Sequence, residues 1–189
     1  MENINNLELW NKVEKTNPKY TKKANIKGNN ITAIAPQYQI KNVTEQFGIY
    51  GKDWGFKYLE FDYTLVEKFG LVVLHAVFFF PGGEFPIKNA QNLFMDNAMT
   101  KIDDNFAKKL ETDTLTKAIS KLGFNADIFL GLFDDVKYLA EVTKEFASLQ
   151  KKPATKDNLI QAKIGGFSID DVKKKYTVTP AQEQEFLTL

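Results

Sequence analysis

The sequence predicts an α+β fold in which a small antiparallel sheet packs on a long helix and a helical tail follows. Residues 70–80 (GLVVLHAVFFF) are apolar at both alternating sets of positions, and a strand of this kind must be covered on both faces. One long helix is expected after it, over 97–122. Because a single helix covers only one face of a small sheet, the other face requires a second layer from the same chain or from a neighbouring subunit. The sequence therefore predicts an oligomer.

Proline and glycine mark the elements that precede this strand. Asn17-Pro18 ends a short amphipathic helix, Pro36 suits the first turn of a second helix, and Gly48 closes that helix. Aromatic and polar residues then alternate, which is typical of a strand. The expected elements are a helix over 7–15, a Lys-rich extended region over 20–34 with a turn at 28–30, a helix over 36–47, and a strand with one slip over 54–63.

The second half of the chain carries a short strand and several helix signals. A tight turn at 81–83 leads into a strand over 84–87. The expected helix over 134–149 starts with two aspartates that suit the helix dipole. A linker at 153–155 divides a core, 1–150, from a small tail, 151–189, which is a candidate partner-binding segment. Capping residues predict tail helices over 156–164, 169–176 and 180–187.

Composition excludes several classes of protein. The 189 residues include no cysteine, so disulfides, thiolate zinc sites and cysteine nucleophiles are excluded. No run of about 18 uncharged apolar residues exists, so we expect no membrane-spanning segment. The N-terminus lacks the basic-then-apolar order of a signal peptide.

The charge is small in sum but uneven along the chain. The formal net charge is +1, whereas residues 11–57 hold nine Lys against three acids. All 25 basic residues are Lys, which supplies point charges to phosphates but lacks the planar fork with which Arg reads guanine. If the protein binds nucleic acid, we expect contacts to the backbone that ignore base sequence. The alternative is a scatter of solvated lysines.

Catalytic signatures are absent. The sequence has neither a GxxxxGK[ST] phosphate loop nor a GxGxxG turn, so we expect no nucleotide cofactor. The single histidine, His75, lies in the most apolar strand, where a core or interface role is expected rather than general-base chemistry. Asp103-Asp104 and Asp134-Asp135 are candidate carboxylate pairs for magnesium, but both are more typical of solvated or helix-start positions.

Two motifs carry a resemblance to a known family. The first is Phe47, Gly48, Gly51 and Trp54. The second lies in the long helix and reads KK-x-x-TD-x-L-x-x-A-x-x-x-LGF; its residues are Lys108, Lys109, Thr112, Asp113, Leu115, Ala118, Leu122, Gly123 and Phe124. Their order resembles the phage single-strand annealing proteins of the Sak type, relatives of the eukaryotic Rad-fifty-two recombination mediator. Asp135 and Tyr138 follow in the same order, and the resemblance covers 22–149.

The resemblance implies a β-β-β-α annealing core that assembles into rings or helical filaments. It implies single-stranded DNA binding in a basic groove, lined by the long helix and an N-terminal hairpin, and annealing without ATP, without cofactor and without hydrolysis. It also implies DNA recombination in the cytoplasm of a bacterial host, with a single-strand binding protein or a phage exonuclease as a further partner. The DNA-binding residues so implied or available are Lys22, Lys23, Lys27, Tyr38, Lys41, Lys52, Lys101, Lys108, Lys109, Lys117 and Lys121.

Several of these assignments have an alternative. Asp104 with Lys108 and Asp113 with Lys117 are favourable i,i+4 pairs, whereas Lys109 and Lys121 have no acid four residues before them and are expected to be freer. Thr116 and Ser120 stand where relatives often carry basic residues. Tyr38, Trp54 and Phe56 are candidates for stacking on bases, although core positions are the usual place for the last two. The alternative functions are a ring-forming interaction protein without nucleic-acid affinity and a carboxylate-dependent nuclease.

Overall fold

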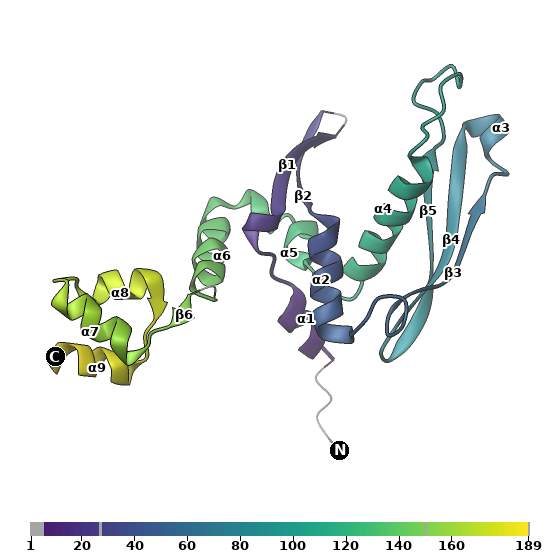
Figure 1. The fold of residues 1–189 in the computed structure, drawn as a ribbon. Coiled ribbons are helices and arrows are strands. Elements are labelled where there is room, and N and C mark those ends of the chain that lie inside the picture. Colours follow the sequence, from purple (N-terminus) through teal and green to yellow (C-terminus); the bar gives the residue numbers. More distant parts are fainter. Residues whose placement is uncertain (1–5, 27, 150, 189) are drawn as a thin grey trace. The chain divides into compact units, whose positions relative to one another are not determined.

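The computed structural model of the protein describes residues 6–26, 28–149 and 151–188 (Figure 1). The chain is mixed α+β with small antiparallel sheets and several helices, as the sequence predicts. It divides into two units, Met1–Asp135 and Val136–Leu189, whereas the sequence predicts a boundary at 150/151. The helix expected over 134–149 therefore groups with the C-terminal residues.

A three-stranded antiparallel sheet forms the larger layer of the N-terminal unit. Its order is β3 (Gly55–Asp62), β4 (Leu71–Phe80) and β5 (Gly83–Asn92), with the short helix α3 (Val66–Phe69) between β3 and β4. The pairing of β3 with β4 shifts once, between Phe56 and Tyr58, whereas the break in the aromatic alternation places the expected slip between Tyr58 and Phe61. The expected end of β5 at residue 87 is wrong, because β5 pairs with β4 as far as Asn92 opposite Leu71. Backbone pairing with β4 extends this strand through polar residues, which give no strand signal in the sequence.

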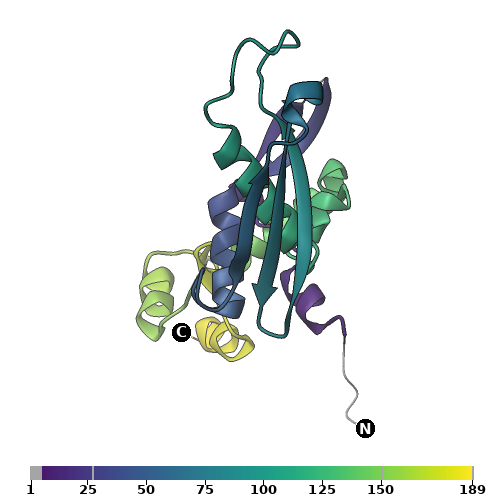
Figure 2. The ribbon, with the colours of Figure 1, turned by 90° about the vertical axis from the view of Figure 1, so that its right-hand side faces the viewer.

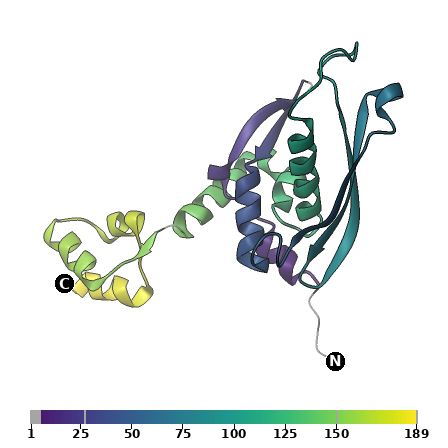
Figure 3. The same ribbon diagram turned by 45° about the vertical axis from the view of Figure 1, so that its right-hand side comes forward.

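One face of the sheet is buried against α4 (Phe106–Ser120). Val72, Leu74, Ala76 and Phe78 alternate along β4 and are all buried. They meet a face of α4 that is buried at Leu110, Leu115, Ala118 and Ile119. This arrangement places the long helix directly on the sheet (Figure 3).

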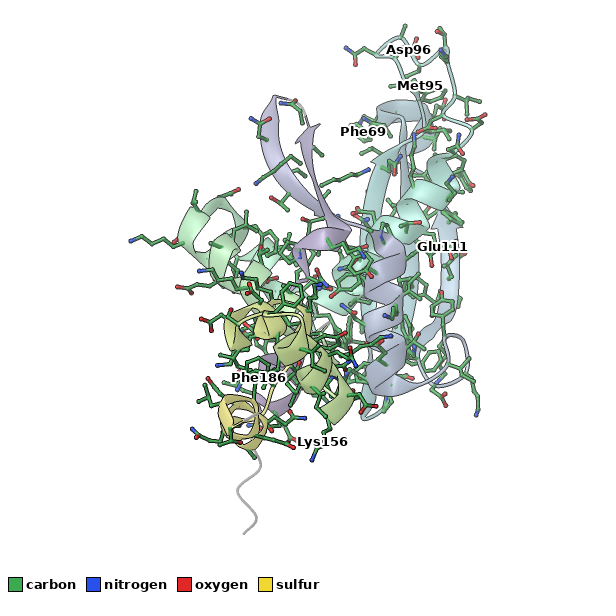
Figure 4. All side chains as sticks on the ribbon, turned by 60° about the vertical axis from the view of Figure 1, so that its left-hand side comes forward. Phe69, Met95, Asp96, Glu111, Lys156 and Phe186 are labelled. Carbon is green, nitrogen blue, oxygen red and sulfur yellow. The ribbon has the colours of Figure 1, made fainter. Side chains whose placement is uncertain are left out.

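The expected start of the long helix at residue 97 is wrong, because residues 93–105 form a loop. The Asp96 carboxylate accepts hydrogen bonds from the backbone N–H groups of Thr100 and Lys101, which bends the chain into a turn. Met99 has a φ of 55°, a left-handed conformation that ends helical geometry. The Asp96 and Met95 side chains lie near Phe69 of α3 at this end of the sheet (Figure 4).

The other helices of the N-terminal unit confirm their sequence signals. These elements are α1 (Glu8–Val13), a 3-10 turn (Pro18–Tyr20), the hairpin of β1 (Thr21–Ile26) and β2 (Asn29–Ile34), and α2 (Pro36–Phe47). Gly48 ends α2 with a φ of 103°, and a Cβ built there would lie 2.4 Å from Oδ2 of Asp53. The loop after α2 therefore requires glycine at this position.

A buried polar network joins the two ends of the N-terminal unit. Asp127, in α5 (Ala126–Phe129), accepts hydrogen bonds from the backbone N–H and the hydroxyl of Thr16 at 2.7 and 2.6 Å. The Asn125 amide donates to the same hydroxyl at 3.0 Å. All three side chains are buried, so these hydrogen bonds hold the segment after α1 against the corner that follows α4. A second 3-10 turn, Leu132–Asp134, closes the unit.

The C-terminal unit contains α6 (Val136–Leu149), α7 (Lys156–Ile164), α8 (Ile169–Lys175) and α9 (Pro180–Thr188). The last three confirm the helices expected in the tail. The linker expected at 153–155 is wrong, because β6 (Lys152–Pro153) pairs in parallel with β7 (Tyr176–Thr177) and Ala154 is buried. Ala154 packs with Leu159, Val172 and Phe186 in a small core of its own.

Candidate nucleic-acid interface

A hollow of about 300 Å³ lies between the β1–β2 hairpin and α4. The hairpin is on one side of α4 and the three-stranded sheet is on the other (Figures 1 and 3). Every lining residue belongs to the N-terminal unit. The hollow is lined by Ile31, Thr32, Ala33, Ile34, Pro36, Thr112, Asp113, Thr116, Ile128 and Phe129. The hairpin and α4 both contribute to this lining, and we call the hollow the hairpin groove.

The polar groups of the hairpin groove are held in place by neighbours. The Thr116 hydroxyl donates to Oε1 of Gln39 on α2 at 3.0 Å, and Thr112 donates to the backbone carbonyl of Lys108. Asp113 accepts from the side-chain amide of Asn89 at 2.8 Å. A side chain of β5 therefore contacts a residue that lines the groove.

Lys117 completes this cluster. Its Nζ lies 3.0 Å from Oδ2 of Asp113, as the i,i+4 spacing predicts, and 2.8 Å from Oδ1 of Asn89. The carboxylate in the groove is thus paired with a cation that remains half exposed. Asp113 orients Lys117, and the lysine offsets a negative charge that would otherwise repel phosphate.

Lys109 is not the free cation that its sequence spacing suggests. Its Nζ lies 2.6 Å from Oδ2 of Asp103, a residue in the loop before α4. The hydrogen bond from Lys109 lowers the pKa of the Asp103 carboxyl below its ordinary value. The expectation failed because it counted only acids one helical turn away, whereas the loop folds back onto the helix.

Two further lysines of the expected set are paired at the surface. Lys23 contacts Asp134 at 3.3 Å and Thr32 at 2.8 Å, and Lys41 contacts Glu45 at 3.4 Å. Exposed pairs of this kind contribute about 0–1 kcal/mol, so a phosphate can compete with either acid.

The remaining lysines of the expected set have no ion pair within the described part of the chain. They are Lys22 on β1, Lys52 after α2, Lys101 in the loop before α4, Lys108 on α4, and Lys121, whose Nζ lies 5.5 Å from the Phe85 ring centroid. Lys22 shares a hairpin face with Ile31 and Ala33 of the groove lining. Lys27 lies outside the described residues.

The structure brings only part of the expected set to one place. Lys22 and Lys23 on the hairpin, with Lys108 and Lys117 on α4, belong to the two elements that flank the hairpin groove. Lys52 and Lys121 follow the C-terminal ends of α2 and α4, whereas the groove is lined by Pro36 at the other end of α2. These two lysines are therefore separate from the groove.

The aromatic candidates are largely engaged within the protein. Tyr38 stacks on Tyr20 with ring centroids 4.2 Å apart, so one face of its ring is covered. Trp54 is fully buried and donates from Nε1 to the Gly48 carbonyl, which confirms its core position. Phe56 packs edge-on against Phe78.

The sequence predicts that a second layer covers the other face of the sheet. Within the described N-terminal unit, that face is uncovered. Leu71, Val73, Val77 and Phe79 alternate on this face of β4 and are partly exposed. Figure 2 shows no described element of the N-terminal unit in front of it. His75 lies in the same row, with Nε2 3.6 Å from Oδ2 of Asp62, and takes no part in the groove.

Within the described ranges, no group of three His, Cys, Asp or Glu side chains is placed to hold a metal ion. Asp103 and Asp134, the leading members of the two aspartate pairs, each contact a lysine instead. None of the described helices is long and apolar enough to cross a membrane.

Sequence reasoning missed Asn89 and Gln39. Both carry ordinary polar side chains, and their roles come from contacts with α4 made by β5 and α2. No local pattern in the sequence indicates either contact. Comparison of the chain with protein-family models and with curated proteins finds no match.

Proposed function

We propose that this protein binds single-stranded DNA through its phosphate backbone and anneals complementary strands without ATP. The observation that carries the proposal is the hairpin groove, together with the lysines on the two elements that form it: Lys22 and Lys23 on the hairpin, and Lys108 and Lys117 on α4. It is bounded by a two-stranded hairpin and a helix, and its lining mixes apolar and hydroxyl groups with one carboxylate, Asp113, whose charge Lys117 offsets. An extended strand can lie along such a groove with its phosphates toward the lysines.

The chemistry of the cations supports backbone binding. A lysine contacts phosphate as a point charge and does not distinguish bases, which suits a protein that must accept any sequence. The bases remain free to pair with a second strand. Duplex formation itself supplies about 1.4 kcal/mol per base step, so annealing requires no nucleotide hydrolysis.

The proposal includes an oligomer, a ring or a helical filament. The partly exposed apolar row on β4 supports it, because a second copy that covers this face removes the row from water. In this setting the protein acts in recombination, with a phage or mobile element in a bacterial cytoplasm as its biological context. The single-strand binding protein and the phage exonuclease belong to the proposal as further partners.

The deciding experiment uses the full chain with complementary dye-labelled oligonucleotides in low salt without nucleotide. We expect strand binding that weakens steeply with salt, because each phosphate contact releases counterions, and annealing faster than that of the free strands. A chain that assembles but neither binds nor anneals DNA is a structural ring instead. Cleavage of the oligonucleotides on addition of Mg²⁺ would assign the chain to the nucleases.

A further inference from the structure

The C-terminal unit carries a pocket that the annealing proposal does not use. It has a volume of about 450 Å³ and lies between α7, the turn after it, α8 and β7. Ala162, Phe167, Val172 and Tyr176 contribute apolar surface, and Gln161 and Lys175 are among the polar residues that line it. Pockets of this size and character accept an apolar side chain with a few flanking polar contacts.

Local contacts hold the wall of this pocket in shape. Ser168 and Asp171 form a capping box at the start of α8, with the Asp171 carboxylate accepting from the Ser168 hydroxyl at 2.7 Å. The backbone N–H of Phe167 donates to the carbonyl of Ala162. Beneath the pocket, Val172 packs with Leu159 in the buried core. The pocket is therefore formed before any partner arrives.

Phe167 is the exposed apolar group of the wall. Its side chain is 56% exposed although it is a large aromatic residue. Gly165 precedes it without a side chain, and a Cβ built there would lie 3.0 Å from the Phe167 ring. The turn thus presents the ring at the pocket instead of enclosing it.

The charge at the pocket is positive. Lys175 places its Nζ 5.9 Å from the Phe167 ring centroid and has no acid partner within the described residues. Lys174 pairs with Asp171 at 2.6 Å, and Asp171 is the only acid among the described residues of the lining. The charge of the acid is therefore already offset, whereas that of Lys175 is available to a partner.

We infer that this pocket docks a peptide segment of a partner protein in which one aromatic or large aliphatic side chain is flanked by Asp or Glu. The apolar residue enters the hollow against Phe167, Val172 and Tyr176, and a flanking carboxylate meets Lys175. The inference does not depend on the proposed annealing function.

The test uses the full chain and a dye-labelled peptide in which one Trp is flanked on both sides by Asp, followed by fluorescence anisotropy. We expect saturable binding that Phe167→Ala and Lys175→Glu each weaken by about tenfold or more, the loss of one interface anchor. Peptides with Ser in place of Trp, or Asn in place of Asp, should lose affinity in the same way.

The controls separate docking from folding and from general charge. Leu187→Ala removes another exposed apolar side chain, and Lys144→Glu makes the same charge change on α6; both should bind the peptide as the unchanged chain does. If Lys175→Glu alters the circular dichroism spectrum, Gln161→Glu at the pocket lining replaces it. Absence of peptide binding, or binding that these variants leave unchanged, overturns the inference. Displacement of the peptide by an unlabelled single strand, blocked by the same variants, would reassign the pocket to nucleic acid.

Discussion

At the scale of single residues, Asp127 links two distant segments of the N-terminal unit. It is buried, and it accepts two hydrogen bonds from Thr16, which lies on a distant part of the chain. A carboxylate in such a place is stable only because its lone pairs are satisfied. The network joins the segment between α1 and the β1–β2 hairpin to α5, which follows α4.

Asp127→Asn should lower the free energy of unfolding of the N-terminal unit by about 1.5–3 kcal/mol, because a charged acceptor is replaced and one donor loses its partner. Urea titration followed by Trp fluorescence checks this, since both tryptophans, Trp10 and Trp54, lie in that unit. Glu67→Gln, an exposed change on α3, should stay within about 0.5 kcal/mol of the unchanged chain. An unchanged urea midpoint for Asp127→Asn would contradict the role assigned to the network.

A second residue-scale prediction concerns Asp171. Hydrogen bonds lower the pKa of its carboxyl from 3.8 to about 2; the largest contribution comes from Lys174 and the next from Ser168. A lowered pKa means that the carboxylate stabilises the folded unit above its ordinary pKa. This contribution is lost as pH falls through the folded value, between about 4 and 2.

Carboxyl-carbon NMR across this pH range should show the Asp171 midpoint near 2 in the unchanged chain. In Lys174→Met the midpoint should rise toward 3.8, because the first of the stabilising hydrogen bonds is removed. Lys173→Met is the matched control, since Lys173 contacts Glu183 instead. Equal midpoints in the two variants would show that Lys174 does not cause the shift.

At the scale of elements, the hairpin groove is formed by two elements that lie far apart in the sequence, the β1–β2 hairpin and α4. The β1–β2 hairpin contributes four consecutive residues of the lining, and α4 contributes Thr112, Asp113 and Thr116. The lysines that flank the groove stand on different elements, so a strand bound there contacts both. If DNA binds in the groove, lysines of both elements should contribute to the salt dependence of its affinity.

Lys22→Ala combined with Lys108→Ala should weaken binding of single strands equally for all base sequences. The slope of log affinity against log salt should become shallower by about 0.7 for each lost phosphate contact. Lys57→Ala with Lys68→Ala removes the same charge from β3 and α3, neither of which lines the groove, and should leave the slope unchanged. Equal loss in both double variants would indicate general electrostatic attraction instead of a groove.

At the scale of the whole molecule, the sheet has one covered and one uncovered face. The buried row on β4 packs on α4, whereas Leu71, Val73, Val77 and Phe79 form a partly exposed row on the other side. The described residues of the N-terminal unit do not supply the second layer that such a strand requires. The proposed oligomer supplies it from another copy.

Val73→Lys with Val77→Lys should therefore shift the protein from oligomer to monomer in sedimentation velocity without lowering its urea midpoint appreciably. Both side chains are partly exposed in the single chain, so the charges remain solvated in the monomer. Val136→Lys, at an exposed position on α6, should leave the assembly intact. Assembly that survives the double change would place the interface on another surface.

Features set by local interactions could be predicted from the sequence, whereas features set by long-range contacts could not. The caps at Pro36, Gly48 and Ser168 and the three tail helices were predictable, because their signals lie within a few residues of the element. The start of α4 and the end of β5 were not, because a loop bent by Asp96 and pairing with β4 decided them. Boundaries fail where long-range contacts outweigh local propensity.

The same division applies to the candidate site. The sequence by itself determined the cations of the chain, all of them lysine, and the two elements, a hairpin and a long helix, that flank the groove. Only the tertiary structure decided which lysines are available: it paired Lys109 with Asp103, linked Lys117 to Asn89, and set Lys52 apart from the groove. Charge is a property of composition, but the availability of a charge depends on which acids the fold brings within a few ångströms of it.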